Sequence, residues 1–357
     1  MQRLEAERGR ATAALARTSD GRALAFRARV FVLATGGIEN ARLLLLSGLG
    51  NEHDQVGRGF MNHPKNYRGV LRLARPVRSA PYFFGCLHGG FAGYGGLRLT
   101  DSVQRELGLL NSYVRLEPLF PWTDDPGVEA LVLFVKHSRL VMRRLRRRGA
   151  EGVVELRDYS ETGDDSDVQN QRKSALDWAR LAGRIALHAP RVLQYLWFRL
   201  VPGAVPRVRA ARLRNFMEME PDPENRVTLS AELDEDGKPL PLVRHRCSAL
   251  DRRSLIALHE ALARELERTG VGRLESDLAR TAEWPITQDA SHHLGTTRMG
   301  ADPATSVVTK DLRVHSVENL YVAGASVFPT SGCANPTFTI VALSIRLAEH
   351  LRGALAR

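Results

Sequence analysis

The segment FVLATGGIENARLLLLSGLG, residues 31–50, has the pattern of a strand, a tight turn and a helix. An apolar run ends at Gly36 and Gly37, and a leucine-rich helical pattern follows as far as Gly48 and Gly50. Glycine favours the end of a helix because it adopts left-handed backbone angles without strain. The segment therefore predicts a buried strand that turns directly into a helix.

A second unit of the same kind lies near the carboxyl end. NLYVAGAS, residues 319–326, predicts a strand that runs into glycine, and residues 337–355 predict a mostly apolar helix. Two such units at opposite ends of the chain suggest one α/β layer interrupted by a long insertion. Glycine turns also serve merely to pack a helix on a strand, so the turns alone leave a ligand site and simple packing equally open.

The chain between these units predicts sheet and helix in alternation. Residues 3–33 alternate and contain the turn SDGR, which predicts a hairpin leading into the buried strand. Further elements are expected as sheet at 65–119, helix at 128–148 and 174–200, a polar surface loop at 161–173, turns near 221–225 and 234–239, and a capped amphipathic helix at 248–270. The insertion is therefore expected to be an antiparallel sheet with helices.

Composition and charge limit the classes of partner. The chain has 357 residues, 43% of them hydrophobic, and a formal net charge of +11. Its densest basic runs lie at 143–149 and 206–214, without a recognisable nucleic-acid-binding module or interleaved aromatic residues. We expect no nucleic-acid partner. Residues 189–209 place Trp197 and several leucines beside arginines, so peripheral contact with an anionic membrane surface is an alternative to ordinary packing.

The cysteines and the first residues give weaker indications. Cys86, Cys247 and Cys333 are far apart, odd in number and in no metal-binding spacing, so neither a disulfide framework nor a metal site is expected. Residues 1–10 carry charges where an export signal needs an apolar segment, which predicts a cytoplasmic protein.

Two carboxyl-terminal segments carry a specific family resemblance. They are SHHLGTTRMG, residues 291–300, and the run from Ser326 that contains Pro-Thr and then Asn five residues after that Thr. Their pattern resembles that of the glucose-methanol-choline (GMC) oxidoreductases, and the leucine-rich segment at 37–50 is similar to a second signature of that family. The matching positions are His292, Gly295, Thr296, Met299, Ser326, Pro329, Thr330 and Asn335.

The resemblance implies an α/β fold in which an FAD-binding domain, residues 1–66 and 286–357, encloses a substrate domain at 67–285. It implies oxidation of an alcohol, sugar or polyol by FAD, with electrons passing on to oxygen, a quinone or a haem protein. His292 would be the catalytic base and Asn335 its hydrogen-bonding partner, since a histidine with a pKa near 6.5 is suited to accept a hydroxyl proton. The expected cofactor-binding residues are Gly36, Gly37, Asn40, Gly324, Ala325, Asn335, Pro336 and Thr337.

Several neighbouring residues have competing interpretations. His293 is a second candidate for the base. His63 in the tetrapeptide MNHP is expected to be a structural loop residue near the cofactor, and Arg298 to tie down its own loop. Cys333 is expected to be a packing residue, because no basic residue adjoins it in sequence.

The chain does not open with the Gly-x-Gly-x-x-Gly turn that cradles a dinucleotide pyrophosphate. The resemblance therefore implies a fragment or one half of a split enzyme, with a separate amino-terminal FAD-binding segment as its partner. The alternative function is that of a non-catalytic membrane-surface or interaction protein derived from the same fold.

Overall fold

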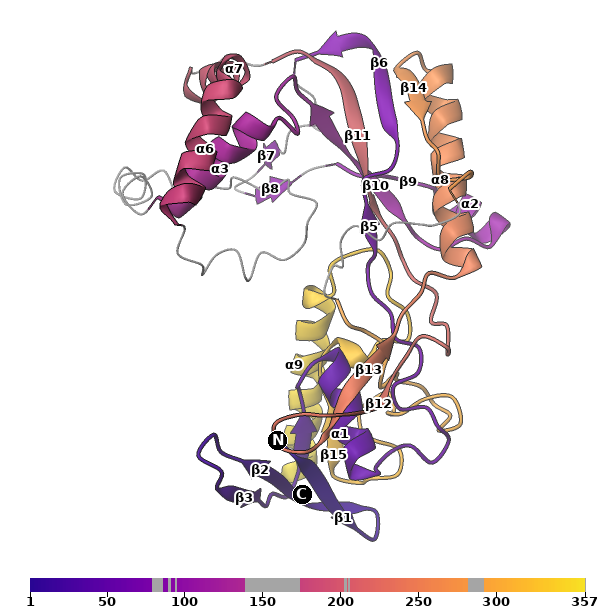
Figure 1. The fold of residues 1–357 in the computed structure, drawn as a ribbon. Coiled ribbons are helices and arrows are strands. Elements are labelled where there is room, and N and C mark those ends of the chain that lie inside the picture. The colour runs from indigo at the N-terminus through magenta and orange to yellow at the C-terminus, as the bar shows by residue number, and fades with distance from the viewer. Residues whose placement is uncertain are drawn as a thin grey trace.

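A computed structural model describes residues 1–78, 86–88, 91–93, 95–138, 174–201, 204, 206–281 and 292–356. Figure 1 shows two bodies stacked along the long axis of the molecule. The lower body contains both chain termini, and the upper body contains a large antiparallel sheet flanked by helices. The mixed α/β fold class expected from the sequence is confirmed.

The chain begins with a small antiparallel sheet on the lower body. Its strands β1 (Arg3–Glu7), β2 (Arg10–Arg17) and β3 (Ala23–Phe26) pair in sequence order. The expected hairpin lies between β2 and β3, and the additional strand β1 joins β2 through a turn in which Arg8 and Gly9 both have positive φ. This sheet packs on the next helix, since the Leu4 amide donates to the hydroxyl of Ser47.

The two expected strand-turn-helix units lie side by side in the lower body. Strand β4 (Phe31–Leu33) pairs in parallel with β15 (Leu320–Val322), although almost 300 residues separate them in sequence. Strand β4 leads into helix α1 (Gly37–Ser47), which ends at Gly48 with left-handed backbone angles, as predicted. Strand β15 leads into a short 3-10 helix, η2 (Ala325–Val327). The two ends of the chain thus build one layer.

The upper body is built on an antiparallel sheet of strand order β14-β6-β11-β10-β9, with β5 pairing to β11. The long helix α8 (Ala249–Arg268) covers one face of this sheet with Leu255 and Leu258. A capping box at Ser248 begins α8. Gly270 follows its last turn, as the sequence predicted. The strands are β5 (Lys65–Asn66), β6 (Val70–Val77), β9 (Leu97–Arg98), β10 (Tyr113–Leu119), β11 (Val208–Phe216) and β14 (Gly272–Glu275).

Three helices form a cluster at one end of the upper sheet. They are α3 (Pro126–His137), α6 (Ala175–Leu187) and α7 (Ala189–Leu200). The single helix expected at 174–200 is divided at His188, because Pro190 favours the first turn of a new helix. The remainder of the helix expected at 128–148 and the loop expected at 161–173 lie outside the described residues.

Two smaller elements of the insertion complete the upper body. The short helix α2 (Asp101–Leu107) lies within the region expected to be sheet, where Thr100 caps it through its side chain. Strands β7 (Cys86–His88) and β8 (Phe91–Gly93) form an antiparallel pair.

A hairpin from the middle of the sequence joins the lower body. Strands β12 (Arg226–Leu233) and β13 (Pro239–Arg244) flank the predicted turn, and the Asp234 amide donates to the Lys238 carbonyl there. The hairpin packs against α1, where Arg42 contacts both the Pro239 carbonyl and the Asp234 carboxylate. Part of the segment 67–285 therefore lies beside residues 1–66, and the boundaries of the two domains remain a hypothesis.

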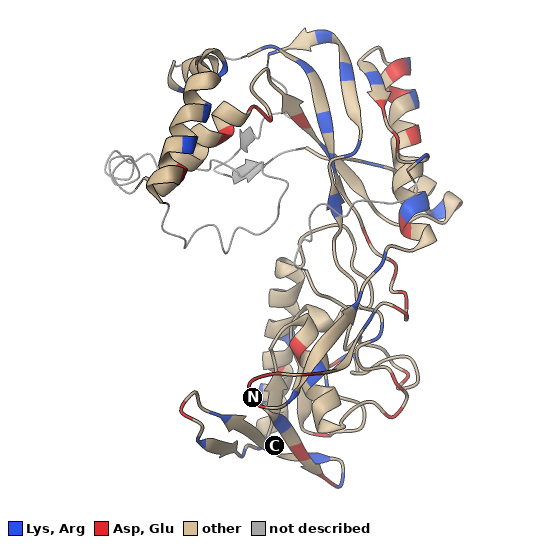
Figure 2. Cartoon of the chain, in the orientation of Figure 1, with Lys and Arg blue, Asp and Glu red and all other residues tan. Residues whose placement is uncertain are grey.

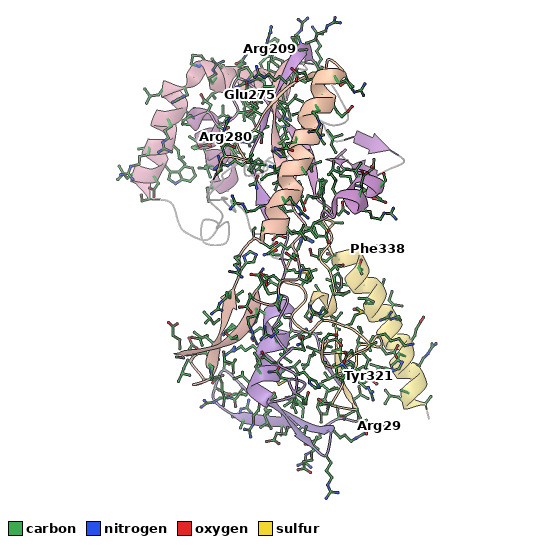
Figure 3. The ribbon with its side chains drawn as sticks, turned by 90° about the vertical axis from the view of Figure 1, so that its right-hand side faces the viewer. Arg29, Arg209, Glu275, Arg280, Tyr321 and Phe338 are labelled. Atoms are coloured by element: carbon green, nitrogen blue, oxygen red, sulfur yellow. The ribbon has the colours of Figure 1, made fainter. Side chains whose placement is uncertain are left out.

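Helix α9 (Thr337–Leu355) runs along the outside of the lower body (Figure 1) and matches its predicted span. Leu347 is its only fully buried residue among those described. Figure 3 shows Phe338 at the upper end of the helix, and this side chain is 86% exposed. The apolar residues Val341 and Ile345 continue an exposed stripe down the same helix.

Candidate active site

The carboxyl ends of the parallel strands β4 and β15 each carry a glycine with unusual backbone angles. Gly36 has φ 94° and Gly324 has φ 103°, values that residues with a Cβ rarely adopt. Apart from each glycine's chain neighbours and, for a helical glycine, the nearby backbone of its own helix, no atom of the described residues lies within 4 Å of the position that a Cβ would take at either glycine. Both turns therefore leave backbone open at the sheet edge where α/β folds bind ligands.

Asn40 joins these two turns through its buried side chain. Its Oδ1 accepts hydrogen bonds from the amide and hydroxyl of Thr35, at 2.9 and 2.7 Å. Its Nδ2 donates to the Ala323 carbonyl at 3.1 Å and to the Ser326 hydroxyl at 2.9 Å. The amide group is thus engaged on both sides, and a direct contact between Asn40 and a cofactor remains a prediction.

The segment around His292 runs alongside the second turn. The amides of Thr297 and Met299 donate to the carbonyls of Ser326 and Val327, both at 2.9 Å. The Thr296 hydroxyl donates to the Gly37 carbonyl, which ties the same segment to the first turn. The two carboxyl-terminal motifs are therefore neighbours in space, together with the start of α1.

Two glycines permit this close packing. A Cβ at Gly37 would lie 2.1 Å from the His293 carbonyl oxygen. A Cβ at Gly295 would lie 2.1 Å from the Gly59 carbonyl oxygen, and Gly295 also has φ 85°. Any side chain at either position would force the backbone segments apart.

The central feature of the site is a pair of histidines. His63 Nδ1 and His292 Nδ1 lie 2.8 Å apart, and the two rings meet edge to face with an interplanar angle of 81°. On its other side, His63 Nε2 lies 3.2 Å from the Ser331 carbonyl oxygen. His63 is almost completely buried, and it links His292 to the loop that precedes α9.

Asn62 aligns the two segments that carry these histidines. Its Oδ1 accepts the backbone amide of His63 at 2.8 Å and that of His292 at 3.1 Å. Met61 and Leu294 exchange two backbone hydrogen bonds of 3.0 Å one step further along. The two segments therefore run antiparallel, with a fixed register at the histidine pair.

The loop between η2 and α9 forms the other side of the site. The Ser331 hydroxyl accepts the Met219 amide at 3.1 Å, and Glu218 accepts the Gly332 amide at 3.0 Å. Residues 218–219 lie two and three positions after the end of strand β11, so the upper sheet holds this loop. Asn335 lies exposed on the same loop, immediately before Pro336 caps α9.

Burial determines the charge state of His63. It lowers the pKa of this histidine, and the hydrogen bond to Ser331 opposes that shift. A proton on His292 and the positive charge of Lys65 would each lower the pKa further. His63 is therefore neutral at pH 7.

The competing residues from the sequence have distinct surroundings. The His293 ring lies against Phe60, with centroids 5.6 Å apart, and so contacts different neighbours from those of His292. Arg298 donates to the Thr305 carbonyl at 2.9 Å, which confirms that it ties down its loop. Burial raises the pKa of the Cys333 thiol, which agrees with a packing role.

The predicted cofactor residues gather around the two glycine turns. Gly36, Gly37 and Asn40 surround the start of α1, while Gly324 and Ala325 lie on the adjacent turn. Open backbone at two strand ends and the amino terminus of α1 fit part of a dinucleotide such as FAD, because helix amino termini favour phosphate. Asn335, Pro336 and Thr337 lie at the start of α9, and all these assignments remain predictions.

The sequence did not identify the roles of Asn62 and His63. Both lie in MNHP, where His63 was expected to be a structural loop residue near the cofactor and Asn62 had no predicted role. The available signal was an Asn-His pair directly after the apolar residues Phe60 and Met61, where polar side chains need partners if they are buried. Those partners come from residues more than 200 positions away, so spacing could not reveal them.

Within the described residues, no group of His, Cys, Asp and Glu could hold a metal ion. The helices in that part of the chain also include none that is long and apolar enough to span a bilayer.

Comparison with known proteins identifies the family. Two GMC oxidoreductase profiles match the chain, one at residues 1–65 and one at residues 221–344, and together they cover more than half of it. Paromamine 6'-oxidase of Streptomyces fradiae is 37% identical over 147 residues, which are 40% of this chain and 26% of that protein. The fructose dehydrogenase large subunit of Gluconobacter japonicus is 26% identical over 91% of this chain and 47% of its own length.

The chain therefore spans about half the length, or less, of these curated relatives. Among solved structures, the pyridoxine 4-oxidase from Mesorbium loti aligns with a TM-score of 0.48 and 14% identity, over 99% of this chain and 57% of that one. A formate oxidase gives a TM-score of 0.48 and 18% identity over 59% of its chain. The two profile matches establish that the chain belongs to the GMC oxidoreductase family.

Proposed function

We propose that the chain supplies the catalytic carboxyl-terminal part of an FAD-dependent oxidoreductase acting on the CH–OH group of an alcohol, sugar or polyol. The observation that carries this proposal is the His63–His292 pair, held within the same network as two open glycine turns. Relatives named as a paromamine 6'-oxidase and a fructose dehydrogenase support this substrate class.

The proposed chemistry divides an alcohol oxidation between the cofactor and this chain. FAD, when bound, accepts the hydride that leaves the carbinol carbon. A ring nitrogen of His292 accepts the hydroxyl proton, so that a C–H and an O–H bond break while a carbonyl forms. The exposed Asn335 amide donates a hydrogen bond to the same oxygen without competing for the proton.

We further propose that a separate amino-terminal FAD-binding segment completes the lower body. A parallel sheet normally has both faces covered, but the β4–β15 pair has Val32 exposed and α9 presents the apolar stripe Phe338, Val341 and Ile345. A β-α segment that pairs with this sheet and covers the stripe would supply the remaining pyrophosphate contacts. This partner is argued from the exposed apolar surface.

Flavin binding and reduction test both proposals. The chain is expected to bind FAD weakly alone and stoichiometrically once the amino-terminal segment of a relative is supplied. The FAD-loaded protein should then be bleached anaerobically by at least one of glucose, fructose, mannitol, glycerol and benzyl alcohol. Tight FAD binding by the chain alone would contradict the partner proposal. A loaded protein that no alcohol, sugar or polyol reduces would contradict the oxidoreductase proposal.

One surface favours a second property, contact with an anionic membrane. Leu187 at the end of α6 is 83% exposed, and Leu193, Trp197 and Leu200 form an exposed line along one side of α7. Figure 2 shows basic residues on this helix pair, all of them arginines. Asp177 is the only acidic residue among the described positions 174–201, beside Arg180, Arg184, Arg191 and Arg199. Apolar side chains flanked by arginines suit the interface of an anionic bilayer.

Vesicle sedimentation separates this property from the oxidoreductase proposal. Binding should occur on vesicles that contain phosphatidylserine and should fall several-fold in the double variant Leu193→Ser with Trp197→Ser. The matched control, Phe338→Ser, changes an exposed aromatic residue on α9 and should bind vesicles as the wild type does. Equal binding of the double variant and the wild type would contradict the membrane contact. Vesicle binding by a protein that never takes up flavin would favour the non-catalytic alternative.

A further inference from the structure

The hydrogen bond between His63 and Ser331 fixes which nitrogen of His63 carries the proton. His63 Nε2 lies 3.2 Å from a backbone carbonyl oxygen, and a carbonyl can only accept. Nε2 must therefore be the N–H of the neutral ring. Nδ1 of His63 is then a lone-pair acceptor.

The same reasoning extends to His292. Its Nδ1 lies 2.8 Å from the acceptor Nδ1 of His63, so the His292 nitrogen must be the donor. In neutral His292, the second nitrogen, Nε2, then holds the lone pair. We infer that His63 is a positioning residue that fixes the tautomer of His292 and thereby selects His292 Nε2 as the nitrogen that takes the substrate proton. This inference rests on the proposed function of His292 as the base.

The surroundings of His63 keep this arrangement intact when His292 becomes protonated. A second proton on His63 would remove the acceptor, but burial and the charge of Lys65 on β5 both oppose it. Of the described titratable groups on the adjoining segments, Glu218 accepts the Gly332 amide, burial raises the pKa of Cys333, and the His293 ring lies against Phe60. His292 can therefore donate to His63 through Nδ1 both when its ring is neutral and when it is protonated.

The contact also affects how strongly His292 holds a proton. Hydrogen bonds from a charged donor are stronger than those from a neutral donor, so the acceptor on His63 stabilises the imidazolium form of His292 more than its neutral form. Loss of the acceptor should lower the pKa of His292. It should also release the neutral ring to adopt either tautomer.

Two variants of His63 distinguish the loss of its hydrogen-bond acceptor from the loss of its side-chain volume. His63→Asn places an amide oxygen close to the position of Nδ1 and keeps an acceptor. His63→Leu fills similar space without any acceptor. The first readout is ¹⁵N NMR of the full chain labelled at histidine, with His292 assigned by its absence from a His292→Gln sample. Because this readout needs no flavin, it tests the inference independently of the proposed reaction.

We expect neutral His292 to be an Nδ1–H tautomer in the wild type and in His63→Asn, and to become mixed or Nε2–H in His63→Leu. A wild-type Nε2–H tautomer would overturn the inference. An unchanged tautomer in a folded His63→Leu protein would do the same. If His63→Leu does not fold, the wild type and His63→Asn still show whether neutral His292 is the Nδ1–H tautomer.

The pH dependence of flavin reduction gives the second readout, in the FAD-loaded protein. His63→Leu should reduce at least about 10-fold more slowly at its plateau, and the acid limb of its profile should move to lower pH. If His63 served only folding or flavin retention, His63→Leu would lower the amplitude of flavin reduction without shifting the acid limb of the pH profile. That result would overturn the inference. If His292→Ala reduces flavin as fast as the wild type, the proposed base is wrong, whereas an unshifted limb in His63→Leu with an inactive His292→Ala refutes only the positioning role.

Discussion

Helices α8 and α9 are similar in length, 20 and 19 residues, yet they bury very different amounts of their surfaces. Helix α8 buries Leu255 and Leu258 completely against the upper sheet. Helix α9 buries only Leu347 among its described residues, while Phe338 and Ile345 face solvent. Apolar residues at helical spacing normally mark the face of a helix that packs against another element. On α9 this apolar face is exposed.

The sheets beneath the two helices explain this difference. The upper sheet has six antiparallel strands, and antiparallel sheets can be stable with only one face covered. The lower sheet has two parallel strands, β4 and β15, which normally occur only with helices on both faces. The comparison teaches that α9 and the β4–β15 pair leave apolar surface exposed, whereas α8 and the upper sheet bury theirs.

The candidate site crosses this division. His292 is held through His63 and Asn62 by segments that the upper sheet anchors. Asn335 lies exposed at the beginning of α9, on the open side. The proposed base is therefore positioned in this chain as it stands, whereas the setting of Asn335 depends on what covers α9.

The largest expected effect on stability comes from equivalent truncations on the two helices. Leu255→Ala should lower the free energy of unfolding by about 2 to 5 kcal/mol, because it removes fully buried atoms and leaves a cavity. Val341→Ala on α9 should change it by less than about 0.5 kcal/mol, because Val341 is exposed in this chain. Urea unfolding followed by circular dichroism measures both. Equal losses of unfolding free energy in the two variants would contradict the exposure of the α9 stripe.

A second expected effect is a pH dependence located on α8. Burial lowers the pKa of His259 to about 4, and its Nε2 donates to the Asn215 Oδ1 at 2.8 Å. The unfolded chain, with a histidine pKa near 6.5, binds more protons between these values. Stability should therefore be complete above about pH 6.5 and fall by roughly 3 kcal/mol as the pH drops towards 4.

The variant His259→Gln isolates this contribution, which is necessary because Asp251 on the same helix acts in the opposite direction. Burial raises the pKa of Asp251 to about 6, so the folded state gains relative stability as that carboxyl becomes protonated. The difference between the wild type and His259→Gln in chemical unfolding at pH 7 and pH 4.5 removes the Asp251 term. A pH-independent difference would refute the assignment.

The smallest of the expected stability effects compares two glycines that occupy helices in different surroundings. Gly37→Ala would place a Cβ 2.1 Å from the His293 carbonyl and should destabilise the chain by about 1 to 3 kcal/mol. Gly183→Ala on α6 meets no atom within 4 Å and should stabilise by up to about 1 kcal/mol. Thermal unfolding of both variants gives the comparison. Shifts of the unfolding midpoint in the same direction for both variants would contradict it.

Much of this fold could be predicted from the sequence because its signals are local. The span of α9 and the caps of α8 follow from hydrophobic periodicity, Ser248 and Gly270. The division of the helix at 174–200 follows from Pro190, a signal that was present but outweighed by continuous periodicity. Helix α2 was missed because it is short and lies within alternating sequence.

The site was less accessible to prediction because long-range contacts assemble it. The motif around His292 could be matched, but its partner His63 lies 229 residues away in sequence. The packing of the β12–β13 hairpin against α1 also depends on a distant ion pair, between Arg42 and Asp234. Residue spacing along the chain does not predict contacts between such distant residues, so the three-dimensional structure was needed to identify them.

The central claim is that the packed side of the site supplies the base and the open side supplies a supporting hydrogen bond. Anaerobic stopped-flow reduction of the FAD-loaded protein tests it most directly, with flavin content measured for every variant. The account predicts that His292→Ala retains FAD and reduces it roughly 100-fold to 10,000-fold more slowly, while Asn335→Ala loses less and His293→Ala little. Near wild-type reduction by His292→Ala, or a loss confined to His293→Ala, would contradict it.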